Sequence, residues 1–139
     1  MGYRFLKDIS RSDVAVRVTS ATLSGLISQA GAAFNRIIIM KPGLLPSDNT
    51  KKFSIYFKTE EELMFKFLNK LVYYKDVNNL LFRRFRATKT KGHMVIEARG
   101  GRIDPEKIKP VVDIKAITMH KFSVARKKGK WSMTAVFDV

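Results

Sequence analysis

The 139-residue chain contains no cysteine, and this absence excludes a disulfide scaffold, a thiol nucleophile and a thiolate zinc site. It also favours a reducing, cytoplasmic location. Histidine is scarce, because only His93 and His120 occur, and two imidazoles cannot complete a zinc site. A Ser-His-Asp hydrolase would need one of these histidines together with a serine, and no serine lies in a recognisable nucleophile elbow. We therefore do not expect hydrolysis of that class.

Long apolar runs are absent as well. The longest run is Ile37–Met40, far short of the roughly 18 to 20 residues that span a bilayer. The amino terminus has no apolar signal core either, so we expect no membrane partner. Gly100 and Gly101 precede Arg102 and lack the spacing of a phosphate-binding glycine loop. We therefore expect the chain to bind no nucleotide on its own.

Acidic residues are few, and this makes the chain strongly basic. There are 12 Asp and Glu against 27 Lys and Arg, which gives a formal net charge of +15. Such an excess makes a polyanion a candidate partner. The basic residues are spread along the chain and form no tail, so a basic solvated surface without a polyanionic ligand explains the composition equally well.

The pattern of apolar residues predicts a single α+β domain spanning residues 1–139. Apolar residues recur at spacings of three and four over 23–38 and 60–76, which predicts two helices. Thr22 is a candidate N-cap for the first, and Thr59 with Glu62 forms a candidate capping box for the second. Alternation predicts strands at 14–18, 52–58, 80–90, 93–99, 114–126 and 130–137, with a further edge strand beginning at 3–6. The order β-α-β-α-β-β-β-β favours two helices packed on one face of a mostly antiparallel sheet.

One predicted strand combines arginines with aromatic residues. Arg83, Arg84 and Arg86 are interleaved with Phe82 and Phe85, a combination typical of surfaces that bind single-stranded nucleic acid. Alternation places Phe85 on the face opposite Arg84 and Arg86, so we expect this ring in the core. The last predicted turn adds further candidate RNA contacts, Lys128 and Lys130. A solvated basic turn is the alternative interpretation of these lysines.

Carboxylates at the two ends of the chain are the best candidates for binding a metal. Asp8 and Asp13 bracket a polar bend, and Asp138 stands beside the terminal carboxylate of Val139. If the last strand runs beside the first, these oxygens come together, and a divalent cation or a lysine would relieve their repulsion. Acids that are simply solvated at the chain ends remain the alternative.

Several local runs resemble the archease family, the protein partners of the RNA ligase that joins 3′-phosphate or cyclic-phosphate ends in tRNA splicing and RNA repair. The resemblance covers nearly the whole chain and rests on the runs 5–9, 12–15, 67–71, 79–85, 113–120 and 131–139. It implies that the chain activates the ligase by promoting its GTP-dependent guanylylation and its repeated turnover. It also implies that the chain is not itself an enzyme, and that GTP is bound only within the ligase complex.

The resemblance also implies functional residues. It assigns a divalent cation, namely calcium, magnesium or manganese, to Asp13, Asp138 and Val139. Lys115 matches a lysine that the family uses functionally. Further candidates are His120, Asp113, which stands where relatives usually have glutamate, and Asp8.

Two positions depart from the family pattern and bear on the ligase interface. Lys70 and Gly101 stand where glutamate is common, so we expect contacts with the ligase to differ here. Two other functions remain as alternatives. The first is a basic RNA-binding module that contacts tRNA directly, and the second is a small metal-dependent hydrolase.

Overall fold

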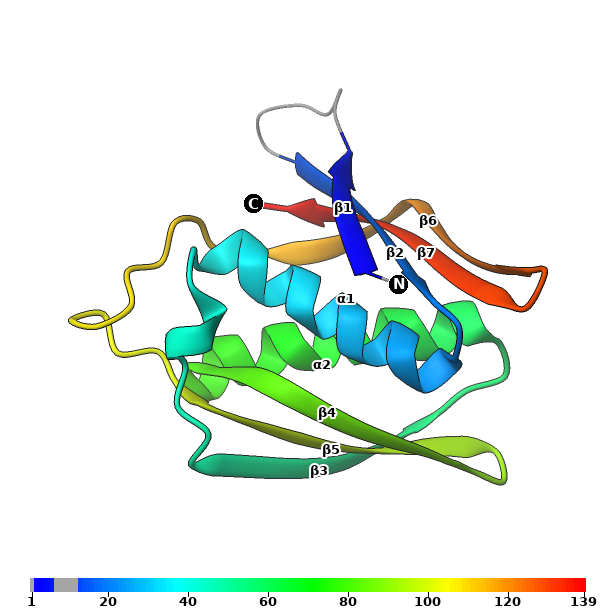
Figure 1. Cartoon of the computed structure of the whole chain (residues 1–139), viewed down its shortest axis with the longest axis horizontal. Helices are drawn as coiled ribbons and strands as arrows, with labels where there is room; N and C mark the ends of the chain where they lie inside the picture. Colours follow the sequence, from blue (N-terminus) through cyan, green and yellow to red (C-terminus); the bar gives the residue numbers. More distant parts are fainter. Residues whose placement is uncertain (1, 7–12) are drawn as a thin grey trace.

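The computed structural model describes residues 2–6 and 13–139. Figure 1 shows the helices lying between two layers of strands. The elements in chain order are β1 (Gly2–Leu6), β2 (Asp13–Ser20), α1 (Leu23–Ile38), the 3₁₀ helix η1 (Pro42–Leu44), β3 (Asn49–Tyr56), α2 (Glu60–Asn78), β4 (Leu80–Thr90), β5 (His93–Arg102), β6 (Ala116–Lys127) and β7 (Lys130–Asp138). The α+β class and the predicted order of elements are confirmed, with β1 as the additional edge strand.

The strands form two sheets, where the sequence pattern suggested one. The first sheet has the order β1-β2-β7-β6 and the second β3-β5-β4, and every pairing is antiparallel. The two helices lie between the sheets, so each sheet has one face toward the helices and one face away from them (Figure 1). The segment 103–115, which joins β5 to β6, carries the chain from the second sheet to the first. This arrangement leaves two outer sheet faces available for function.

Both helices begin at the residues that the sequence predicted. The Thr22 hydroxyl accepts a hydrogen bond from the Gly25 amide at 3.0 Å, and the Thr59 hydroxyl accepts one from the Glu62 amide at 3.2 Å. The Glu62 carboxylate accepts a hydrogen bond from the Lys58 amide at 2.6 Å. In a standard capping box this carboxylate would accept from the amide of the N-cap residue, Thr59, which is one residue later. The hydrogen bond from Lys58 lowers the pKa of Glu62.

The core fills the space between the two sheets. The largest fully buried side chains include Phe34 of α1, Phe67 of α2, Phe82 of β4 and Phe137 of β7. Phe85 packs edge-on against Phe67 with ring centroids 5.3 Å apart, which confirms that this ring belongs to the core. In the part of the chain that the structure describes, neither helix is long and apolar enough to cross a membrane.

Gly100 lies where strands β4 and β5 approach each other closely. It pairs with Phe82 in β4, next to an irregularity in the β4–β5 register between Phe82 and Arg84. A Cβ atom at Gly100 would lie 2.5 Å from the Phe82 Cα and would also overlap the Leu81 carbonyl. Both are main-chain atoms of a paired strand, so they cannot move aside without breaking the ladder.

We therefore expect Gly100→Ala to lower the free energy of unfolding by about 3 kcal/mol, the upper end of the range for overpacked cores. Urea denaturation followed by circular dichroism measures this change. Gly43→Ala is the control, because a Cβ atom there meets nothing within 4 Å, and we expect a change below about 1 kcal/mol. Equal stability of the parent and Gly100→Ala would contradict the close strand approach.

Candidate functional site

Two of the predicted metal ligands come together at one end of the first sheet. Asp13 of β2 is the register partner of Asp138 of β7, and Asp138 is in turn the partner of Ala116 in β6. Side chains of partner residues in an antiparallel ladder lie on the same face, with Cβ atoms roughly 5 Å apart. The next residues, Val14 and Phe137, pack into the core, so the two carboxylates lie on the outer face. Strand pairing between the two ends of the chain thus brings these oxygens together.

Val139 follows this pair directly and packs its side chain against the core. Its main-chain oxygens are therefore held next to Asp138. Asp8, the remaining candidate ligand, lies outside the described residues.

Lys115 is held beside Asp138 by its main chain. The Lys115 amide donates a hydrogen bond to the Asp138 carbonyl at 2.7 Å, and the Lys115 side chain is exposed. Ile114, the preceding residue, is fully buried. The backbone of Lys115 is therefore fixed next to the carboxylate pair, while its ammonium group remains accessible to a partner.

Asp113 makes a contact that the sequence did not reveal. Its carboxylate accepts a hydrogen bond from Lys75 Nζ at 2.7 Å, and the Lys75 ammonium also pairs with Asp76. The Lys75 side chain is only 5% exposed. Burial lowers the pKa of Lys75, but the hydrogen bonds and charges of Asp113 and Asp76 outweigh this effect and leave the pKa above its ordinary value. The contact ties segment 113–115 to the end of α2 and thereby supports Lys115.

His120 lies on a bulge of β6. Thr118 pairs with Val136 and Ser123 with Thr134, so four residues of β6 lie opposite a single residue of β7. Lys121 has a left-handed backbone with φ of 59°, and His120 is exposed. The bulge displays His120 on the edge strand of the sheet, on the same strand as Ala116 beside the carboxylate pair.

The donor atoms suit a hard divalent cation. Carboxylate and main-chain oxygens are the ligands that calcium, magnesium and manganese prefer. Over residues 2–6 and 13–139, no three His, Asp or Glu side chains form a group that could hold a metal ion. Asp13 and Asp138 are two side-chain ligands of the kind that these cations accept, and cation binding by them together with a main-chain oxygen of Val139 stays a prediction.

The predicted RNA contacts separate into three places. Arg84 and Arg86 are exposed on β4, and their register partners in β5 are Arg99 and Glu97. Arg83 instead donates a hydrogen bond to the Leu45 carbonyl at 3.1 Å. The two candidate lysines, Lys128 and Lys130, lie at the β6–β7 turn of the other sheet.

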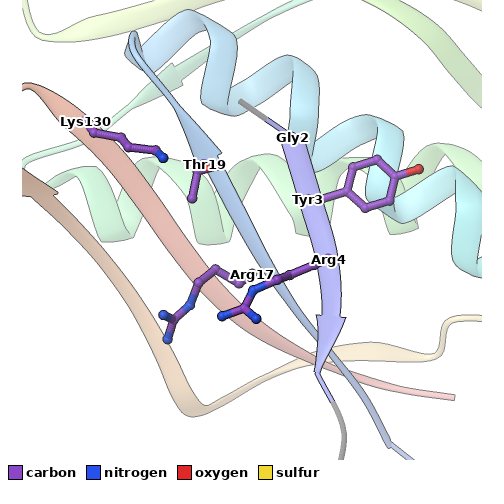
Figure 2. A pocket seen from close by; sticks show the side chains of 6 residues that line it. All are labelled: Gly2, Tyr3, Arg4, Arg17, Thr19 and Lys130. Carbon is purple, nitrogen blue, oxygen red and sulfur yellow. The ribbon is translucent and has the colours of Figure 1, made fainter.

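A shallow hollow of about 370 Å³ lies on the outer face of the first sheet. Figure 2 shows Arg4 of β1 and Arg17 of β2 extending over the same face, while Tyr3 points to the other side. Arg4 and Arg17 are register partners, and Lys130 of β7 also lines the hollow. This cationic cluster occupies the same sheet face as Asp13, which lies four residues from Arg17 along β2. Only Lys130 of this cluster was among the residues predicted from sequence.

The structure gives each of the two departures from the family pattern a local explanation. Lys70 Nζ lies between 5.4 and 5.8 Å from the ring centroids of Phe53, Tyr73 and Tyr74, so it covers an aromatic cluster by cation–π contact. A Cβ atom at Gly101 would lie 2.9 Å from Asp48 Oδ1, and the ring of Pro46 occupies the same space. A glutamate at position 101 would therefore require the loop before β3 to move.

The chain is similar to proteins of one known family over nearly its whole length. The model of the archease protein family matches residues 3–139. The protein archease of Pyrococcus furiosus is 28% identical over 137 residues, covering 92% of this chain and 93% of that protein. The protein archease of Pyrococcus abyssi is 36% identical over 84 residues, covering 57% and 59% of the two chains.

Solved structures show the same fold. The solution structure of Methanobacterium thermoautotrophicum protein 1598 aligns with a TM-score of 0.81 at 17% identity and covers 99% of both chains. The crystal structure of an archease from Thermotoga maritima, described as a possible chaperone, aligns with a TM-score of 0.66 at 18% identity and covers 98% of both.

Proposed function

This chain belongs to the archease family, and from that membership together with its carboxylate pair we propose that it is a non-catalytic activator of an RNA ligase. The ligase is the one that joins 3′-phosphate or cyclic-phosphate RNA ends in tRNA splicing and repair. In this proposal the chain acts in the cytoplasm, promotes guanylylation of the ligase by GTP, and restores the ligase for repeated turnovers. GTP is bound only within the joint complex.

The observation that carries the proposal is the in-register pairing of Asp13 with Asp138 beside the anchored Lys115. Two carboxylates and an ammonium group on one accessible edge can bind a divalent cation and a phosphate group together. Asp13, Asp138 and Val139 would hold the cation, which when bound supplies positive charge for phosphate oxygens. Lys115 would supply a second positive charge from the protein itself.

The surrounding residues position this site and offer it to the ligase. Asp113 holds the segment that carries Lys115 through its contact with Lys75. The bulge that displays His120 adds an exposed surface on β6 for the ligase. The chain supplies a binding surface and no nucleophile in this proposal, so the covalent chemistry takes place on the ligase.

Ligation by the cognate ligase tests this function. The ligase is held substoichiometric to a 3′-phosphate RNA, with GTP and divalent cation present, and ligated product is measured with and without this chain. We expect single-turnover product without the chain and many turnovers with it. The chain alone, without ligase, should convert no RNA.

Lys115→Ala provides the site-directed arm of this test. Loss of one charge-assisted contact should reduce stimulation about tenfold or more. Lys109→Ala removes the same charge from an exposed position in the same segment and should preserve stimulation. Equal product with and without the parent chain would reject the activator function.

A further inference from the structure

The outer face of the second sheet has an unusual surface. Its exposed positions form four rows across β3, β5 and β4, because register partners share a face. The rows are Tyr56, His93 and Thr90; Ser54, Val95 and Thr88; Lys52, Glu97 and Arg86; and Thr50, Arg99 and Arg84. At about 3.3 Å per residue, the first row lies about 13 Å from the third and about 20 Å from the fourth. The face therefore offers a track for an extended ligand.

Positive charge dominates one end of this track. Arg84 and Arg99 are direct cross-strand partners, an arrangement of like charges that opposes strand pairing. Lys52 and Arg86 flank Glu97, the single acidic residue in the four rows. Within the described ranges, none of these four cations forms an ion pair with a carboxylate. Strand pairing gains nothing from the Arg84–Arg99 pair, whereas an anionic ligand would be stabilised by it.

An exposed aromatic pair occupies the other end. The rings of Tyr56 and His93 are stacked with centroids 4.6 Å apart and an angle of 27° between their planes. Tyr56 is 64% exposed, and His93 Nε2 is held by the Thr90 hydroxyl at 2.8 Å. A rigid, solvent-facing ring pair on a strand is a platform on which a base can stack.

The composition of the face favours nucleic acid over a protein partner. Protein interfaces centre on apolar and aromatic anchors surrounded by a polar rim. Between the aromatic row and the cationic rows this face carries only Ser54, Thr88 and the half-buried Val95. Hydroxyls and guanidinium groups instead suit phosphate and sugar oxygens.

We propose that this face, formed by Lys52, Tyr56, Arg84, Arg86, His93 and Arg99, binds a short stretch of single-stranded RNA. A base stacks on the Tyr56–His93 pair, and the following phosphates lie on the rows of cations. This site belongs to the β3-β5-β4 sheet, whereas the carboxylate pair belongs to the sheet on the other side of the helices (Figure 1), and it acts independently of the ligase.

Fluorescence anisotropy with a labelled 12-nucleotide single-stranded RNA tests the proposal on the full chain. At 50 mM salt, Arg84→Gln/Arg99→Gln should bind about 100-fold more weakly, because two charge-assisted contacts are lost. The plot of log affinity against log salt concentration should also become shallower by about 1.4 for this variant, since each phosphate contact on a single strand contributes about 0.7 to the magnitude of the slope. Tyr56→Ala should also weaken binding about tenfold but leave the slope unchanged, because stacking carries no charge.

Arg4→Gln/Arg17→Gln is the matched control. It removes a cross-strand arginine pair of the same charge from the other sheet, where the neighbouring rings of Tyr3 and Phe5 meet edge-on and are not stacked. We expect its RNA affinity to stay within about twofold of the parent, which separates the site from a general effect of net charge. All substituted side chains are exposed, and circular dichroism confirms that each variant is folded.

Three results would overturn the proposal. They are no binding of RNA by the parent, an equal loss in the Arg4→Gln/Arg17→Gln control, and displacement of the RNA by polyglutamate at the same charge concentration. Asp13→Asn/Asp138→Asn should bind RNA as the parent does. Failure of ligase activation and failure of RNA binding are therefore distinguishable.

Discussion

Asp13→Asn/Asp138→Asn is expected to lower the affinity for a divalent cation by more than about 100-fold. Asparagine keeps the shape of each side chain and removes both negative charges from the paired positions of β2 and β7. Loss of residues that merely support a metal ligand costs about 10- to 100-fold in affinity, so loss of two direct ligands should cost more. The variant should lose stimulation of the ligase together with its affinity for the cation.

Isothermal titration with calcium, magnesium and manganese measures this affinity. A cation that binds the folded chain also raises its melting temperature, and that shift should be present in the parent and absent from the variant. Asp104→Asn/Glu106→Gln makes the same change of charge in an exposed loop and should bind cations as the parent does. Unchanged cation affinity in Asp13→Asn/Asp138→Asn would exclude these residues as ligands.

Asp76→Asn/Asp113→Asn is expected to destabilise the fold by about 3 kcal/mol at neutral pH. The double variant leaves the ammonium group of Lys75 buried without either of its carboxylate partners. Removing one partner of a buried ion pair lowers the free energy of unfolding by about 3–5 kcal/mol. Because Asp113 is exposed, we expect a value at the lower end of this range. Urea denaturation measures the change.

The dependence of stability on pH should change sign in this variant. In the parent, the pKa of Lys75 is raised, so its stabilising contribution is present below the unfolded pKa of about 10.4 and is lost as the pH rises through the higher folded value. Without the carboxylates only burial remains, and burial lowers the pKa of Lys75. The unfolded variant then binds more protons than the folded one, so its stability should rise with pH toward about 10.4.

A triple variant separates the ion pair from packing. Adding Lys75→Met to Asp76→Asn/Asp113→Asn removes the buried charge and keeps most of the side-chain volume, so stability should return close to that of the parent. Equal stability of the double variant and the parent would mean that the ion pair contributes nothing to the fold.

The local elements of this fold could be predicted because their signals are local. The spacing of Leu26, Ala30 and Phe34 predicts the face of α1 that is buried in the structure. The N-cap residues Thr22 and Thr59 predict where the two helices begin. The sequence shows that Asp13 and Asp138 meet if the first and last strands lie side by side. The β2–β7 register meets this condition.

Features that depend on non-local register could not be predicted. Nothing in the alternation of β4 and β5 indicates that they leave the sheet of β6 and β7 and form a second sheet with β3. Arg99 and Lys52 join Arg84 and Arg86 only once the strand order is known. Lys75 lies near the end of α2, and no local sequence pattern indicates its burial, which accompanies the contact of its ammonium group with Asp113.

The bulge in β6 has a consequence for self-association. β6 is an edge strand of its sheet, and an uninterrupted edge exposes a row of amides and carbonyls that a second molecule can extend into a fibril. The excursion of residues 119–122 and the left-handed Lys121 interrupt that row. Deleting residues within the excursion to restore a continuous ladder would therefore remove a built-in barrier to aggregation as well as displace His120.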